Sequence, residues 1–155
     1  MKGIVVYFSR WGNCKKVAEA IYNGIKDSSH DVSLSAVGSL DGLEKDLDFM
    51  VIGSPTRAGK AAGPIRRFIK REVVESSEKV DFAAFGTGLA SVIKKDATMS
   101  ADNIYKILKD TMREPIAPPF RATVKGMRGP LADGEVQRAL EFGKKLGQLL
   151  GEKSQ

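Results

Sequence analysis

Residues 3 to 21 read GIVVYFSRWGNCKKVAEAI, and the architecture of the whole chain follows from this stretch. Its first part, GIVVYF, is a continuous run of mainly β-branched and aromatic residues, typical of a strand that is buried on both faces. Val17, Ile21 and Ile25 then recur at intervals of four, which predicts a helix with one apolar face. A buried strand that leads directly into a helix is the unit from which parallel sheets are built.

Strands and helices continue to alternate along the chain. Further strands are expected at residues 31–37, 47–54, 80–88 and 119–126, and further helices at 63–72, 100–112 and 133–151, with Ser100 or Asp102 capping the helix at 100–112. Continuously apolar strands belong in the centre of a parallel sheet, and the alternating ones at 31–37 and 119–126 belong at its edges. This pattern predicts a three-layer α/β/α sandwich with a five-stranded parallel sheet of order 2-1-3-4-5.

Length and composition are those of one globular domain. The chain has 155 residues, of which 42% are apolar and 28% charged. We expect a single domain over residues 1–150, a frayed tail at 151–155, and a monomer or small homo-oligomer. No apolar run reaches the roughly 18 residues that cross a bilayer, and no signal peptide is visible. The single cysteine and single histidine leave no basis for a disulfide framework or a metal site, and we expect a cytoplasmic protein without membrane contact. His30 is expected to be solvated.

The net charge of +6 raises the question of an anionic partner. Basic residues are mixed with acids, as in KREVVESSEK at 70–79, and neither an aromatic-rich RNA motif nor zinc-finger spacing is present. The pattern therefore argues against nucleic acid. It favours an anionic cofactor or an acidic protein partner.

The candidate site follows from the expected topology. In a doubly wound sheet, ligands bind beyond the carboxyl ends of the strands, where the loops SRWGNC (9–14), SPTRAGKAAG (54–63) and GTGLAS (86–91) converge. Ser9, Asn13 and the first N–H groups of the following helix are suited to a phosphate. The first loop contains neither a P-loop nor a dinucleotide fingerprint, and Cys14 lacks the arginine of a low-molecular-weight phosphatase. From this loop alone, a plain strand-to-helix turn that binds nothing remains equally open.

Three segments in register resemble the flavodoxin-like superfamily. VVYFSRWGNCKKVAEAI resembles the phosphate loop of flavodoxins, VIGSPTRAGKAAGPIRRFI their second loop, with SPTRAG most similar to the NAD(P)H:quinone oxidoreductase branch, and AFGTGLAS their third loop. The resemblance implies non-covalently bound FMN. By position, it implies that the cofactor is held by Ser9, Arg10, Trp11, Gly12, Asn13, Cys14, Pro55, Thr56, Arg57, Ala58, Gly59, Thr87, Gly88 and Leu89. Cys14 stands where the family usually has a hydroxyl residue, and its place at a helix N-terminus predicts a lowered thiol pKa.

Three functions fit these observations. The first is an FMN electron carrier without catalytic side chains of its own, whose redox partner proteins are acidic. The second is an NAD(P)H-dependent oxidoreductase of quinones or related acceptors, which SPTRAG favours. The third is a flavodoxin-like interaction module that has lost FMN.

Overall fold

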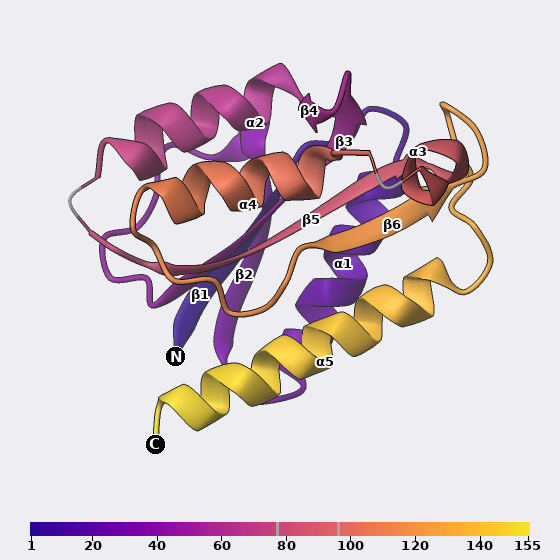
Figure 1. Ribbon diagram of the computed structural model, residues 1–155. Coiled ribbons are helices and arrows are strands. Elements are labelled where there is room, and N and C mark those ends of the chain that lie inside the picture. The colour runs from indigo at the N-terminus through magenta and orange to yellow at the C-terminus, as the bar shows by residue number, and fades with distance from the viewer. Residues whose placement is uncertain (77, 96) are drawn as a thin grey trace.

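The protein is a three-layer α/β/α sandwich (Figure 1), as seen in a computed structural model that describes residues 1–76, 78–95 and 97–155. The parallel strands are β1 (Lys2–Tyr7), β2 (Asp31–Ala36), β3 (Phe49–Arg57), β5 (Asp81–Leu89) and β6 (Phe120–Val124). They lie in the order β2-β1-β3-β5-β6, which confirms the predicted topology. A two-residue strand, β4 (Lys60–Ala61), pairs antiparallel with the end of β3. It was not predicted, because the sequence places it inside the expected second loop.

Helices cover both faces of the sheet. One face carries α1 (Asn13–Lys26) and α5 (Glu135–Lys153), and the other carries α2 (Gly63–Phe68), η2 (Ile69–Val74) and α4 (Ser100–Asp110) (Figure 1). Two short helical segments, η1 (Val37–Ser39) and α3 (Ala90–Lys94), complete the elements. Within β1, Val5 packs in the core beneath α1 and α5, whereas Ile4 and Val6 pack in the core beneath α2 and α4. A central strand must therefore be apolar at every position.

Some element boundaries differ from the sequence-based expectation. The helix expected at 63–72 is an α-helical segment that continues as the π-helical segment η2 up to Val74. The helix α5 continues to Lys153 and thereby includes part of the expected tail. The expectation that His30 is solvated was wrong, because its Nε2 lies 2.8 Å from the carbonyl oxygen of Gly147 on α5. That hydrogen bond joins the turn before β2 to the C-terminal helix.

The free edge of strand β6 is partly covered by side chains of the following helix, α5. The N–H of Thr123 donates to a carboxylate oxygen of Glu135 at 2.6 Å, and a guanidinium nitrogen of Arg138 donates to the carbonyl of Arg121 at 3.3 Å. These bonds use backbone groups that an edge strand would otherwise expose. Among the described residues, no helix combines the length and apolarity needed to cross a membrane.

Candidate cofactor site

A pocket of about 670 Å³ lies at the carboxyl edge of the sheet. It is lined by the predicted site residues of all three loops, except Gly12, which lies in the first loop without lining the pocket. The sequence analysis missed four lining residues, Val92, Val124, Met127 and Arg128. Within the described ranges, no cluster of His, Cys, Asp or Glu could hold a metal ion.

The first loop presents backbone donors to the pocket. Gly12 has φ = +92°, a left-handed conformation that favours glycine, and its N–H donates to Ser9 Oγ at 3.1 Å. The first hydrogen bond within α1 runs from Lys16 N to Gly12 O at 3.1 Å. The N–H groups of Asn13, Cys14 and Lys15 therefore precede the first N–H that donates within the helix, and they lie at the positive end of the helix dipole. This end of the pocket suits an anion.

Cys14 is a core residue rather than a reactive thiol. Its side chain is only 2% exposed and belongs to the apolar core beneath α1 and α5. Burial raises the pKa of the Cys14 thiol well above its ordinary value. The expected lowering at the helix N-terminus was therefore wrong, because desolvation of the thiolate outweighs the helix dipole.

Trp11, in the first loop, contacts the loop between β6 and α5. The residue is 46% exposed, and the guanidinium carbons of Arg10 and Arg128 lie 5.1 Å and 4.7 Å from the centroid of its indole ring. Asn13 Nδ2 donates to the carbonyl of Arg128 at 3.0 Å and ties this β6–α5 loop to the first loop. The sequence carries no local signal for this contact, because it arises only when β6 and β1 lie in one sheet.

The second loop is a tight hairpin between β3 and β4. Thr56 pairs with Ala61 and Arg57 with Lys60, so only Ala58 and Gly59 remain as the turn. Both have positive φ, +50° and +79°, which is the conformation of a type I′ turn. Alanine is unfavourable at such a position, so the backbone beside the pocket is strained at Ala58.

Buried hydroxyl groups hold the second loop in place. Thr56 Oγ1 donates to the carbonyl of Thr87 at 2.8 Å and accepts from the N–H of Ser100 at 3.0 Å. Ser100 Oγ donates to the carbonyl of Ser54 at 2.6 Å, and Ser54 Oγ accepts from the N–H of Ala62 at 2.8 Å. Ser100 is thus the first residue of α4 and not its cap, while Asp102 accepts from the N–H of Met99 as expected of a capping carboxylate. The loop is fixed from three elements, β3, β5 and α4.

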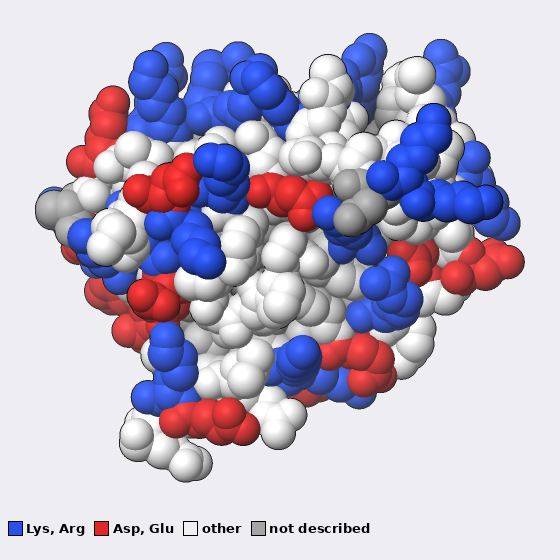
Figure 2. Space-filling view, viewed as in Figure 1, with Lys and Arg blue, Asp and Glu red and all other residues white. Residues whose placement is uncertain are grey.

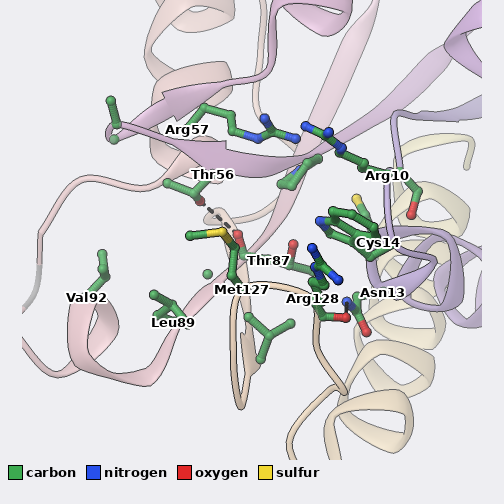
Figure 3. A pocket seen from close by; sticks show the side chains of 17 residues that line it. Arg10, Asn13, Cys14, Thr56, Arg57, Thr87, Leu89, Val92, Met127 and Arg128 are labelled. Atoms are coloured by element: carbon green, nitrogen blue, oxygen red, sulfur yellow. Dashed lines mark hydrogen bonds between the residues drawn. The ribbon is translucent and has the colours of Figure 1, made fainter.

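The pocket is polar at one end and apolar at the other. Arg10 and Arg57 extend toward each other from the first and second loops, and Arg128 lies beside Asn13, while Leu89 and Val92 line the far side (Figure 3). The described lining includes three arginines and no carboxylate. Such a pocket fits a ligand with an anionic end and a planar apolar end.

A known protein family shares this sequence pattern. A family model described as a flavodoxin domain matches residues 4–125. The chain belongs to the flavodoxin family. The flavodoxin match begins in β1 and ends just beyond β6, so it includes all three loops that line the pocket.

Solved flavodoxins share the fold over nearly their whole length. A flavodoxin from the domain Archaea superposes with a TM-score of 0.82 at 26% identity, covering 97% of this chain and 99% of that one. Oxidised flavodoxin 1 from Bacillus cereus superposes with a TM-score of 0.78 at 16% identity, covering 96% and 98%. A curated relative, NAD(P)H dehydrogenase (quinone) from Geotalea daltonii, is 30% identical over part of its length. That alignment covers 44% of this chain and 46% of the relative, so the chain spans less than half of the relative's length.

Proposed function

We propose that this chain binds FMN non-covalently and serves as an electron carrier. The observation that carries the proposal is the polarity of the pocket, with Arg10, Arg128 and the first N–H groups of α1 at one end and the apolar side chains of Leu89 and Val92 at the other (Figure 3). FMN has the matching chemistry, a terminal phosphate and a planar ring system. When bound, it supplies one- and two-electron chemistry that side chains lack.

The chain's own residues would hold the two ends of the cofactor separately. The phosphate would lie in the first loop, against Ser9, Asn13 and the amide groups that precede Lys16. The ribityl chain and ring would lie along the hairpin that includes Ala58 and Gly59. Thr87, Gly88 and Leu89 would close the other side of the ring. A larger residue is excluded at Gly88, because a Cβ there would collide with the buried side chain of Met99.

A carrier is favoured over an enzyme by the absence of acid–base groups. Among the described lining residues, the ionisable side chains are three arginines and Cys14. Arginine stays charged at any physiological pH, and burial raises the pKa of the Cys14 thiol. Neither kind of side chain is therefore suited to act as a general acid or base near neutral pH. Electron transfer through a bound flavin requires no such side chain from the protein.

The partners of such a carrier would be redox proteins with acidic surfaces. The net charge of +6 favours association with negatively charged proteins and slows association with positively charged ones. We place the carrier in the cytoplasm on the basis of its cysteine content, one thiol and no disulfide pair.

A fluorescence-quenching titration with FMN, riboflavin and FAD tests the proposal. FMN should bind at least about 30-fold more tightly than riboflavin, because even one charge-assisted contact to the phosphate contributes roughly 2 kcal/mol. FAD should also bind more weakly, since its riboflavin phosphate is joined to AMP by a pyrophosphate bond and is not terminal. Equal affinity for FMN and riboflavin would contradict the proposal that the pocket binds FMN through its phosphate. A protein that binds no flavin at all would instead favour an interaction module.

A quinone reductase is the second candidate. It is supported by the second-loop sequence SPTRAG and by the partial likeness to a relative named NAD(P)H dehydrogenase (quinone). The two candidates differ in one cheap assay on the FMN-loaded protein. Rapid oxidation of NADH or NADPH with a quinone acceptor would favour the reductase, and its absence would favour the carrier.

A further inference from the structure

One side of the molecule carries a dense group of cations that begins at the pocket. Residues 55–71 contain six basic residues and no acidic one. We call these six residues the basic face: Arg57, Lys60, Arg66, Arg67, Lys70 and Arg71. All six are exposed. Figure 2 shows Lys and Arg side chains projecting along the edge of the molecule formed by α2 and η2.

The charges of the basic face are not neutralised by ion pairs with the described residues. Some lysines elsewhere pair with acids, as Lys2 does with Glu44 at 2.5 Å and Lys153 with Asp81 at 2.6 Å. No ion pair of that kind involves the basic face among the residues that the structure describes. Its charges are therefore available to a binding partner.

The spacing of these cations opposes helix stability. Arg66 precedes Lys70 by four residues and Arg67 precedes Arg71 by four, within the continuous segment formed by α2 and η2. Like charges at this spacing lie on the same side of a helix and repel each other. This mutual repulsion lowers the stability of the helix, as is expected where a surface serves recognition.

The basic face is continuous with the mouth of the pocket. Arg57 and Lys60 flank the turn of Ala58 and Gly59, which lines the pocket. Across the pocket, Met127 is 82% exposed and Trp11 is 46% exposed. Tryptophan, methionine and arginine are enriched in protein–protein interfaces. An apolar centre bordered by cations is typical of a protein-binding surface and differs from a uniformly charged groove for nucleic acid.

We propose that the basic face, together with Trp11 and Met127, is the docking surface for an acidic redox protein. This rests on the proposed function, since a partner bound there would cover the pocket in which FMN is placed. Complementary charge would orient the partner over the pocket and raise the association rate at low ionic strength. The contact of Trp11 and Met127 would exclude water from the path between the two redox centres.

The test compares two double variants with the same change in net charge. Arg66→Glu/Lys70→Glu alters the basic face away from the pocket lining. Lys144→Glu/Lys145→Glu alters exposed lysines on α5, which covers the opposite face of the sheet. The probe is an acidic plant-type 2Fe–2S ferredoxin. Its binding is measured by calorimetry and its electron exchange with the FMN-loaded protein by stopped flow, from about 20 mM to about 500 mM salt.

The basic-face variant should lower both the affinity for ferredoxin and the second-order rate constant at least about tenfold at low salt, with a flatter salt dependence. The α5 variant should change both by less than about threefold. Arg66→Gln/Lys70→Gln should fall between wild type and the glutamate variant. Because none of these positions lines the pocket, FMN affinity should be equal in all four proteins.

Other outcomes would overturn the docking surface. Equal losses in the two glutamate variants would assign the effect to net charge alone. Tighter binding of a DNA duplex or of anionic lipid vesicles than of ferredoxin, lost in the basic-face variant, would assign the surface to that ligand. Failure of the wild type to bind FMN would count against the proposed function only, because calorimetry with ferredoxin reads docking without the cofactor.

Discussion

The guanidinium of Arg128 lies 4.7 Å from the centre of the Trp11 ring, and this contact joins the β6–α5 loop to the β1–α1 loop at the pocket. The backbone takes part as well, because Asn13 Nδ2 donates to the carbonyl of Arg128 at 3.0 Å. Arg10 contributes a second guanidinium at 5.1 Å from the same ring. The β6–α5 loop therefore lines the pocket together with the three loops that the sequence indicates.

Arg128→Ala should weaken FMN binding about 5- to 30-fold, which corresponds to roughly 1–2 kcal/mol. The variant loses a cation at the end of the pocket proposed to hold the phosphate. It also loses the cation–π contact with Trp11, which contributes about 0.5–1 kcal/mol at an exposed site. Riboflavin, which lacks the phosphate, should bind with unchanged affinity. Fluorescence quenching with both ligands measures the difference.

Lys125→Ala is the matched control for Arg128→Ala. It removes the same charge from the same loop, but Lys125 pairs with Asp133 at 3.3 Å and does not line the pocket. A similar loss of FMN affinity in both variants would mean that loop charge, and not the position of Arg128, determines binding.

Cys14 should make the free energy of unfolding depend on pH in the alkaline range. Burial raises the pKa of its thiol in the folded state, whereas in the unfolded chain the pKa is about 8.5. Above that pH the unfolded state releases a proton that the folded state retains, so stability should fall by up to about 1.4 kcal/mol per pH unit. Urea unfolding between pH 7 and pH 10 measures the slope. The folded thiol should also react slowly with a disulfide reagent at pH 8, and fully in denaturant.

Cys14→Thr is the control for this dependence, because threonine has no group that titrates there. In this variant the free energy of unfolding should fall less steeply with pH than in the wild type, because the contribution of the thiol is missing. Its FMN affinity should be equal or higher, since a hydroxyl is a better phosphate donor than a thiol. Rapid labelling of the folded wild-type protein would contradict the buried position of Cys14.

The order of the strands could be predicted because every central strand is buried on both faces. β1 must be apolar at each position, since Val5 faces one core and Ile4 and Val6 face the other. Such a run differs from the alternating pattern of β6, where only Phe120, Ala122 and Val124 are buried. The hydrophobic pattern of a strand therefore indicates whether it lies in the centre or at the edge of the sheet, before any contact is known.

The pocket lining was predictable only as far as strand ends determine it. Each predicted site residue lies at the carboxyl end of a central strand or in the turn that follows it, whereas Met127 and Arg128 belong to the loop after an edge strand. The role of Ser100 could not be predicted from the sequence either, since its hydroxyl contacts the carbonyl of Ser54 only when α4 packs on β3. The burial of Cys14 and the hydrogen bond of His30 likewise depend on tertiary packing.

Ala58→Asn should stabilise the protein by about 0.5–1 kcal/mol, because asparagine adopts positive φ at lower cost than alanine in a type I′ turn. The φ of +50° at Ala58 is the strained feature that the substitution relieves. Thermal unfolding measures the gain, expected as about 2–4 °C. Gly59→Ala is the opposite control, because the φ of +79° there would become strained. A loss of stability in Ala58→Asn would contradict the assigned turn.

Ser100→Ala should destabilise the protein by about 1–3 kcal/mol and weaken FMN binding through the second loop. Its hydroxyl is fully buried and donates to the carbonyl of Ser54, which is left without that donor in the variant. Urea unfolding and a flavin titration measure the two effects. Ser39→Ala, at an exposed position in η1, should alter neither. An unchanged stability in Ser100→Ala would show that the hydrogen bond does not hold the loop.

Arg57 and Lys60 should make bound FMN easier to reduce. They flank the hairpin beside the pocket and have exposed, unpaired side chains in the described structure. A cation about 10 Å from an anion, at an effective dielectric of about 20, stabilises it by roughly 1.7 kcal/mol before screening. For a one-electron step, about 1.4 kcal/mol corresponds to about 59 mV. Since fully reduced FMN tends to be an anion, Arg57→Ala and Lys60→Ala should each lower the potential of the second electron by tens of millivolts at low salt.

Two controls separate the effect of Arg57 and Lys60 on the flavin potential from an effect of net charge: the salt dependence and a substitution of a distant lysine. The shift should shrink as ionic strength rises, because exposed charges are screened over about 10 Å at 0.1 M salt. Lys144→Ala removes the same charge from α5 and should leave the potential within the error of the titration. If Arg57→Ala and Lys60→Ala also leave it unchanged at low salt, their side chains point into solvent too far from the cofactor to act. The basic face would then serve docking alone, because steering a partner requires only long-range charge, whereas tuning a potential requires proximity to the flavin.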